Sequence, residues 1–342
     1  MLTKRHEMSV FAIALLAAVG CLSAIATPLS AQQTIVRLEN RAVRDEADRL
    51  LSLGQQQAQD GQLRNAIKTW QYAIGYYRLV NDQSAITYTL GRVADTYEKM
   101  GATNAAQERM YQRITYANAI ENQGVVMRET NNLASLAISQ NKLEDATTLT
   151  NTALQLSQAY EQPLDRAIAL GNKGLIAGKY GNHLQAIKLY YASIKERPLR
   201  DDIGNGHTYV NSGDSWMAKA NFPAAIKDYG TALTIARQYR NYQLMAVASD
   251  RLIAAYLEVP NFYRIEELLQ NRSSLALVMN DPETAATVQR YLGDLYLSFG
   301  NIPKSRAAYQ TSYDFAASMA ENSYLPMREA YLKLQELEKL DS

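Results

Sequence analysis

The residues able to carry out catalysis are few in this sequence and stand far apart. Of the three histidines, His6 precedes an uncharged N-terminal segment, and His183 and His207 show no spacing typical of a metal or catalytic site. Cys21 is the only cysteine, so neither an intrachain disulfide nor a cysteine-based metal cluster can form. An enzyme needs a positioned nucleophile, an acid/base pair or a metal ion. The sequence therefore predicts a protein that is not an enzyme and holds no metal ion or cofactor.

The segment Gly204-Asn205-Gly206 is a further candidate for chemistry, because glycine-rich loops cradle phosphate groups. It follows Pro198 and is not followed by Lys-Ser or Lys-Thr, the residues that complete a phosphate-binding loop. We expect it to be a linker between two structural elements.

Composition and charge point to a helical protein that does not bind nucleic acid. Apolar residues make up 47% of the chain, and only 17 glycines and 8 prolines occur in 342 residues, as in helical proteins with a continuous core. The 35 basic and 34 acidic residues leave a formal net charge of +1. Proteins that bind nucleic acid usually concentrate basic residues on one face, and no segment here combines a run of Lys and Arg with aromatic residues.

The N-terminal residues 1–31 have the pattern of a signal peptide. Lys4 and Arg5 precede residues 8–26, which contain no charged residue, and small residues before Ala26 and Ala31 offer two cleavage sites. Cleavage after Ala31 is favoured, because a polar Gln-Gln pair would begin the mature chain. We therefore expect a bacterial protein exported to the periplasm or another extracytoplasmic space, with residues 32–40 as a short linker.

Two alternatives would tether the chain to a membrane. The uncharged segment approaches the roughly 20 residues that a membrane-spanning helix needs, so it could be a retained anchor. Cys21 follows Ala18-Val19-Gly20, which is similar to the lipidation motif of bacterial lipoproteins, although that motif usually has Leu three residues before the Cys. In either case the contact with the membrane would be confined to the N-terminus.

A residue typical of turns recurs about every forty residues. The positions are 61, 101, 141, 181, 220, 260 and 300, with one interval of 39. Small residues recur seven positions before each turn and five after it, where two helix backbones would cross, and larger residues recur nine positions after it. The seven-before column is Gly54, Ala94, Ala134, Gly174, Gly213, Ile253 and Gly293, and the nine-after column is Trp70, Met110, Thr150, Tyr190, Tyr229, Leu269 and Tyr309. Such a period predicts repeated helix-turn-helix units.

These columns resemble the signature of the tetratricopeptide repeat over residues 41–320. The forty-residue period is similar to that of the longer repeats in kinesin light chain and Pins-like adaptors. The resemblance implies an all-α, right-handed α-solenoid of about seven repeats, capped by a C-terminal helix in residues 321–342. In repeat six, Pro260 and Ile265 replace the usual turn and small residues, so we expect its two helices to be splayed or shifted.

The resemblance also implies that the first helix of each repeat lines a concave groove for a peptide. Nine residues before the turn, three successive repeats carry an asparagine, whose amide can bond both N–H and C=O of a peptide backbone. The inward positions add charged residues, some of which can equally form pairs within their own helix. The predicted groove residues are Asn132, Asn172, Asn211, Arg92, Asp95, Arg128, Asn131, Asp214, Arg251 and Arg290.

The function implied is that of an exported, non-catalytic adaptor that binds an extended segment of a partner protein. One alternative is a structural role through self-association or a fixed place in an envelope assembly, using the convex face or the cap. Another is a sensor for short peptides, although such regulators are cytoplasmic and carry an effector region not recognisable here.

Overall fold

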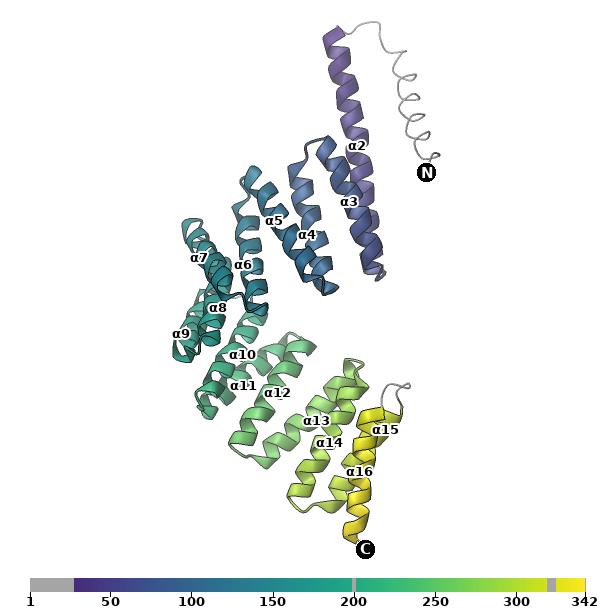
Figure 1. The fold of residues 1–342 in the computed structure, drawn as a ribbon, viewed down its shortest axis with the longest axis vertical. Coiled ribbons are helices and arrows are strands. Elements are labelled where there is room, and N and C mark those ends of the chain that lie inside the picture. The colour runs from purple at the N-terminus through teal and green to yellow at the C-terminus, as the bar shows by residue number, and fades with distance from the viewer. Residues whose placement is uncertain (1–27, 199–200, 319–323, 342) are drawn as a thin grey trace. The chain divides into compact units, whose positions relative to one another are not determined.

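The computed structural model describes residues 28–198, 201–318 and 324–341, and these form helices joined by short turns (Figure 1). The chain divides into two compact units, residues 1–136 and 137–342, and the boundary lies inside helix α6 (Gln123–Ser139). The first unit also holds α2 (Pro28–Gln59), α3 (Leu63–Leu79), α4 (Gln83–Lys99) and α5 (Thr103–Ala119). The second holds α7 (Leu143–Ala159), α8 (Pro163–Lys179), α9 (His183–Glu196), α10 (Asp202–Ala218), α11 (Phe222–Gln238), α12 (Tyr242–Glu258), α13 (Phe262–Val278), α14 (Pro282–Ser298), α15 (Ile302–Ala317) and α16 (Tyr324–Asp341). The predicted all-α architecture of helix-turn-helix units is confirmed.

Most helices are 17 residues long and end in the same three-residue turn. The turn after α2 shows its bonds: the N–H of Gly61 bonds the carbonyl of Ala58 at 3.3 Å, and the N–H of Gln62 bonds that of Gln57 at 2.8 Å. This is a Schellman motif, which needs one residue with a positive φ angle. Seventeen helical residues plus three turn residues make twenty, and two such steps make the forty-residue period. Residues with positive φ are Gly61, Asn81, Gly101, Glu121, Asn141, Glu161, Gly181, Ala220, Arg240, Asn280 and Gly300.

Two places depart from this regularity, and both contain proline. Helix α9 is 14 residues long and ends at Glu196, two residues before Pro198, and this accounts for the single interval of 39. At the other place, the turn that contains Pro260 has no residue with positive φ, and α12 and α13 pack less closely than the helix pairs of repeats one, two, four, five and seven. The expected displacement in repeat six is confirmed.

The segment Gly204-Asn205-Gly206 is not the linker that we expected. Helix α10 begins at Asp202, with Asp201 accepting a bond from the N–H of Gly204 as its N-cap, so all three residues are helical. A side-chain carbon on Gly206 would lie only 2.6 Å from Cδ2 of Leu244 on α12. The glycine at this position therefore serves close packing between helices.

The two ends of the repeat array also differ from expectation in their boundaries. Residues 32–40, expected to be a short linker, are part of the 32-residue helix α2 and continue directly into the first repeat. No proline or glycine interrupts them, so nothing in this segment breaks a helix. Helix α16 packs against α15 in the position predicted for the cap. Residues 1–27, which include Cys21 and most of the predicted signal segment, lie outside the described residues.

Within four repeats, a glycine on the first helix faces an aromatic ring on the second. A side-chain carbon built on Gly213 would lie 2.4 Å from Cε1 of Tyr229, and one on Gly293 would lie 2.4 Å from Cδ1 of Tyr309. The same relation holds for Gly54 with Trp70 and for Gly174 with Tyr190, each at 2.5 Å. Where the first column carries Ala94 or Ile253, the second carries Met110 or Leu269 instead of an aromatic residue. The sizes of the two residues are therefore complementary: an aromatic ring in the second column occurs only where the first column has glycine.

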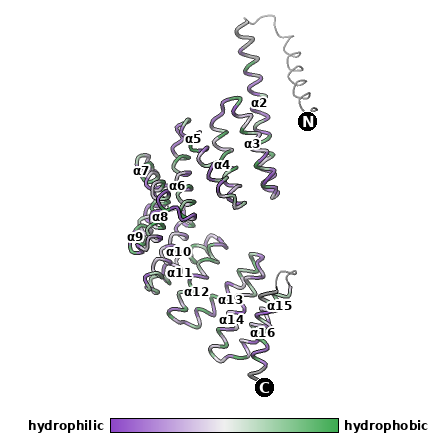
Figure 2. Tube along the Cα trace, viewed as in Figure 1, coloured by the Kyte–Doolittle hydropathy of each residue, from purple (hydrophilic) through white to green (hydrophobic). Residues whose placement is uncertain are grey.

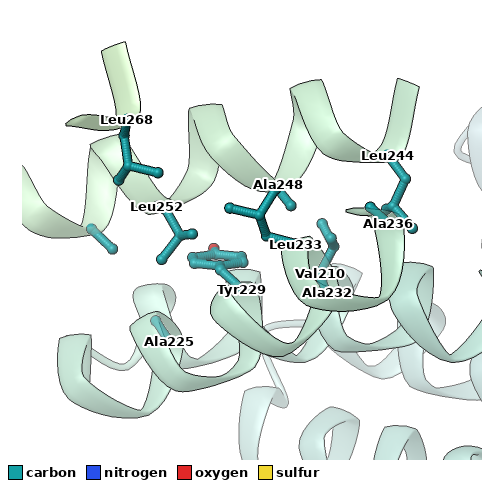
Figure 3. Close-up of a cluster of buried hydrophobic side chains, with 11 residues drawn as sticks. Val210, Ala225, Tyr229, Ala232, Leu233, Ala236, Leu244, Ala248, Leu252 and Leu268 are labelled. Atoms are coloured by element: carbon teal, nitrogen blue, oxygen red, sulfur yellow. The ribbon is translucent and has the colours of Figure 1, made fainter. Parts of the chain in front are cut away.

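The core between helices is formed by apolar faces that alternate with polar ones along each helix (Figure 2). In one cluster, Leu244, Ala248 and Leu252 of α12 lie above Tyr229 and Leu233 of α11 (Figure 3). All five are buried, with the Tyr229 ring fully excluded from solvent. Burial of such side chains contributes about 1.5–3 kcal/mol each for the larger ones.

We predict that Gly213→Ala destabilises the protein by about 1–3 kcal/mol, because the added methyl group overlaps the Tyr229 ring. The midpoint of urea unfolding should fall. Adding Tyr229→Met, which copies the Ala94–Met110 combination, should make the double variant less unstable than the sum of the two single variants.

Gly230→Ala in α11 is the matched control, because a side chain there would meet no atom within 4 Å. It should leave stability unchanged or raise it by about 0.5–1 kcal/mol through better helix propensity. Additive single and double variants would contradict the proposed size matching.

Candidate functional site

The predicted groove residues lie on the first helices of the repeats. We call this surface the first-helix face: α2, α4 and residues 123–136 of α6 in the first unit, and α8, α10, α12 and α14 in the second. The structure leaves some predicted residues accessible on this face and buries others.

In the first unit, Arg92 and Asp95 border a pocket of about 440 Å³. The Nη2 atom of Arg92 lies 3.4 Å from Oδ2 of Asp95, and both side chains remain about half exposed. Their pairing within α4 agrees with the i,i+3 spacing noted in the sequence. The other lining residues are Gln55, Ala58, Gln59, Trp70, Thr96, Glu98 and Lys99. The pocket therefore presents amide, carboxylate and cationic groups above a buried indole.

A second polar cluster in the first unit surrounds Glu129. Its carboxylate, buried between helices, forms an ion pair with Arg113, whose Nε also donates to the carbonyl of Thr87 at 3.0 Å. Burial raises the pKa of Glu129 above its ordinary value, against the opposing effect of the Arg113 guanidinium. Asn132 is half-buried and hydrogen-bonds Glu129, so this predicted peptide ligand is partly engaged within the protein.

Two of the predicted groove asparagines are buried. Asn131 is 1% exposed and Asn172 is 4% exposed, so neither side chain lies open on the first-helix face. Arg128 is exposed, and Asn211 is half-buried on α10. The expectation that the row Asn132, Asn172 and Asn211 is accessible is therefore wrong for Asn172, and the predicted groove residue Asn131 is buried as well.

In the second unit, Asp214 is the centre of a network that joins three helices. Its Oδ1 accepts hydrogen bonds from the hydroxyl of Tyr229 at 2.7 Å and from Nε of Arg251 at 2.8 Å. The Asp214 and Arg251 side chains keep 42% and 50% of their surface exposed. Burial, reinforced by the Asp214 carboxylate, raises the pKa of the Tyr229 hydroxyl, so Tyr229 remains a neutral donor. Both predicted groove residues face solvent while bound to each other.

The same columns produce a related network in the last repeat. The Tyr309 hydroxyl donates to Asp294 at 2.8 Å, and the Asp294 carboxylate also lies 3.3 Å from Nη1 of Arg290. Arg290 in addition pairs with Glu329 of α16 at 3.1 Å and covers the Tyr291 ring at 4.7 Å. This predicted groove residue therefore connects the cap to the repeats.

A buried carboxylate between α9, α10 and α11 was not predicted from the sequence. Asp228 is 2% exposed, and the Tyr191 hydroxyl donates to its two oxygens at 3.0 and 2.9 Å. In the part of the chain that the structure describes, no ion pair to Asp228 is seen. Burial raises the pKa of Asp228 above its ordinary value. The signal was present, because the same column in most other repeats carries an apolar or uncharged residue.

Within residues 28–198, 201–318 and 324–341, no group of three His, Cys, Asp or Glu side chains is placed to hold a metal ion. None of the helices in those ranges is both long and apolar enough to span a membrane. The predicted N-terminal anchor lies mostly outside them.

Solved structures of several tetratricopeptide-repeat proteins are similar to this chain. A signal-transduction ATPase with numerous domains from Pyrococcus horikoshii, which has a tetratricopeptide-repeat sensor, matches 96% of this chain with a TM-score of 0.64 and 16% identity. The match covers 49% of that protein, so this chain spans about half of its length. RapI in its apo form matches 85% of this chain and 99% of its own, with a TM-score of 0.59 and 15% identity.

A Rap protein in complex with Competence and Sporulation Factor matches 86% of this chain and 98% of its own, with a TM-score of 0.53 and 12% identity. At these identities the likeness establishes the fold alone. No protein-family model matches the sequence, and no curated protein matches it in sequence.

We predict that Asp228→Asn stabilises the protein near neutral pH. The folded chain binds the Asp228 proton more tightly than the unfolded chain, because burial disfavours the carboxylate. The contribution of this group is therefore most favourable below the unfolded pKa of about 3.9, and it is lost as pH rises through the folded-state pKa. Urea unfolding at pH 4.5 and pH 7.5 should show a gain for the variant that is larger at pH 7.5.

Asp314→Asn on α15 is the control, because this side chain is exposed. It should not change the difference between the two pH values. An equal loss of stability at both pH values in Asp228→Asn would instead show that the carboxylate is needed as a hydrogen-bond acceptor.

Proposed function

We propose that this chain, which has the tetratricopeptide-repeat fold, is an exported, non-catalytic adaptor that binds an extended segment of a partner protein on its first-helix face. Repeat folds of this type present extended surfaces for binding. Export is supported by the charge and apolar pattern of residues 1–31, and the absence of catalysis by the scattered positions of the histidines. The ligand is proposed to be polypeptide and not nucleic acid, because the net charge is +1.

The observation that carries this proposal is the set of exposed, hydrogen-bonding charges on the first-helix face. Arg92 and Asp95 border the 440 Å³ pocket in the first unit, and Asp214 with Arg251 lies open in the second. Arginine and carboxylate groups can bond the N–H and C=O groups and the charged side chains of a peptide. Their pairing in the free protein holds these side chains in defined positions, which lowers the entropy lost on binding.

Two Rap structures support a peptide as the ligand. One Rap protein is described in complex with Competence and Sporulation Factor, and a Rap conjugation gene regulator of the plasmid pLS20 is described in complex with the Phr* peptide. The second matches 85% of this chain with a TM-score of 0.53 and 12% identity. A sensor for short peptides is therefore a narrower form of the same proposal, with a free peptide in place of a protein segment.

A structural role is the second candidate, and an exposed aromatic cluster favours it. Phe262 packs against Phe299 and Tyr263 with ring centroids 4.3 and 5.6 Å apart. Tyr263 is 79% exposed and Phe299 is 62% exposed, at the adjacent turns of the last two repeats. Exposed apolar clusters of this kind often mark protein interfaces. Self-association or a place in an envelope assembly would use this cluster.

The test is a pull-down from an envelope extract with the full chain and with two variants. The double variant Arg92→Ala/Asp95→Ala and the single variant Arg251→Ala each remove charged side chains that are about half exposed, so the core of the protein is unchanged. We expect a partner retained by the native chain to be bound at least about tenfold more weakly by one or both variants, since a charge-assisted bond contributes about 1.5–3 kcal/mol.

Arg264→Ala/Glu267→Ala is the matched control, an exposed i,i+3 pair on the second helix α13. It should retain the partner, and circular dichroism should show intact helix in all variants. A partner retained equally by every variant would exclude the first-helix face. Loss of that partner on Tyr263→Ser/Phe299→Ser would then favour the structural role.

A further inference from the structure

The exposed sides of α9 and α11 carry an excess of positive charge. These are the second helices of successive repeats, and they lie side by side, because the Tyr191 hydroxyl on α9 bonds Asp228 on α11 (Figure 1). Two cations on each helix lie within about 80° of one another around the helix axis. We call these four exposed residues the basic face: Lys188, Lys195, Lys227 and Arg237. In the part of the chain that the structure describes, no ion pair to any of the four is seen.

The two helices contain one carboxylate each, and both carboxylates are already engaged. Glu196 at the end of α9 forms an ion pair with Arg166 of α8. Asp228 is buried and accepts hydrogen bonds from Tyr191. The column seven residues after the turn places Lys188 and Lys227 on the basic face, and in the other repeats it contains Lys68, Glu108, Thr148, Glu267 and Ala307. Successive repeats therefore both carry a cation in this column only in α9 and α11.

A lysine from a neighbouring turn adds to the basic face. Lys219, which follows α10, and Lys188 both border a cleft of about 390 Å³ at the start of α9. None of the described residues that line this cleft is acidic. Two cations from different elements therefore converge where no carboxylate opposes them, and an anion from outside the chain can bond both.

Beside Arg237, a pocket of about 310 Å³ opens between α11 and α13. The buried side chains of Leu233, Leu252 and Leu268 form part of its lining. Gly230 leaves space in its wall, because a side-chain carbon built there would meet no atom within 4 Å. Arg264 and Glu267 at its rim pair with each other at 2.8 Å, so Arg237 supplies the excess charge. The volume lies at the lower end of the range of ligand pockets, which suits a single side chain.

An apolar pocket beside cations distinguishes between classes of anionic partner. Gly230 lies between Lys227 and Arg237 along α11, so an apolar side chain in the pocket would have a cation on either side. A polypeptide can place such a side chain in the pocket while its own carboxylates reach the cations. Proteins that bind a membrane surface insert protruding apolar side chains into it, whereas the apolar groups here line a recess. The combination therefore favours an acidic polypeptide.

We propose that the basic face of α9 and α11 binds an acidic segment of a polypeptide in which carboxylates flank one apolar side chain. The carboxylates form charge-assisted bonds with the exposed cations, and the apolar side chain fills the pocket beside Gly230. This surface belongs to second helices, so the contact is separate from the one proposed for the first-helix face, and neither depends on the other. Because the cations are exposed, salt weakens the contact.

The test measures binding of two fluorescein-labelled peptides to the full chain by fluorescence anisotropy. The leucine probe has six glutamates on each side of a leucine, and the serine probe has serine in place of the leucine. We expect the leucine probe to bind more tightly, and Lys188→Glu/Lys227→Glu to weaken both probes at least tenfold. Raising the salt concentration from about 0.1 M to about 1 M, which shortens the Debye length from about 10 Å to about 3 Å, should also weaken both.

Gly230→Leu separates the pocket from the charges. The new side chain occupies the pocket, so this variant should bind the leucine probe at least fivefold more weakly and leave the serine probe within twofold. Gly75→Leu on α3 is the matched control, because a side-chain carbon there also meets no atom within 4 Å. It should change neither affinity. Equal affinities of the two probes for the native chain would overturn the proposal, since the pocket would then contribute nothing.

Arg64→Glu/Lys68→Glu is the control for charge, because it reverses two exposed cations on α3, another second helix. It should change the affinity for either probe less than twofold, and circular dichroism should show intact helix in every variant. A loss equal to that of Lys188→Glu/Lys227→Glu would show a nonspecific effect of net charge and overturn the proposal.

Other outcomes identify a different partner or a different surface. Tighter binding of a 12-nucleotide single-stranded DNA or of phosphatidylglycerol vesicles than of the leucine probe, lost in Lys188→Glu/Lys227→Glu, would show that the basic face receives phosphate groups. That result would overturn the proposal. If Arg251→Ala weakened the leucine probe and Lys188→Glu/Lys227→Glu did not, the probe would lie on the first-helix face. This would support the proposed function and overturn the present inference.

Discussion

The close approach of two helix backbones in four of the repeats is the constraint on which the rest of this structure depends. An aromatic ring from the second helix fits against the first only where that helix has no side chain, as at Gly213 and Gly293. The contact fixes which sides of the two helices meet, and so it also fixes which side of the first helix remains free. The position of Asp214 and Arg251 on the first-helix face follows from this packing. The same ring carries the hydroxyl that holds Asp214, so one tyrosine links the core of the repeat to its exposed surface.

Much of the fold could be predicted from the sequence. The repeat spacing, and the small and large residues at fixed positions in each repeat, can be read along the chain without knowing which helices are in contact. The turns that join one repeat to the next were harder to recognise, because residues such as Glu121, Glu161 and Arg240 do not favour a positive φ. Their conformation comes from the two neighbouring helices, whose packing outweighs local preference. Residues 32–40 were misassigned as a linker after the cleavage site, although no proline or glycine interrupts a helix there.

The candidate site was predictable only as far as a helix face can be read from spacing. Asp214, Arg251, Arg92 and Asp95 lie on the surface that the columns indicated. Asn172 shares its column with Arg251 and yet is buried. Whether a residue at one position is buried depends on the size of the side chains on adjacent helices. Those side chains differ between repeats, and the residues that share one position in the repeats do not reveal them. The same applies to Asp228, whose partner Tyr191 is 37 residues away and on another helix.

The turn that contains Pro260 has a mechanical consequence for the second unit. Proline has no N–H to donate, and this turn lacks the residue of positive φ that the Schellman motif requires. Between α7 and α16, α12 and α13 are the least closely packed of the consecutive helices. An array of stacked repeats under tension yields where the fewest contacts must be broken, so the compliance of this unit is concentrated at one joint. The neighbouring helix pairs, with their ring-to-backbone contacts, behave as stiffer segments on either side of it.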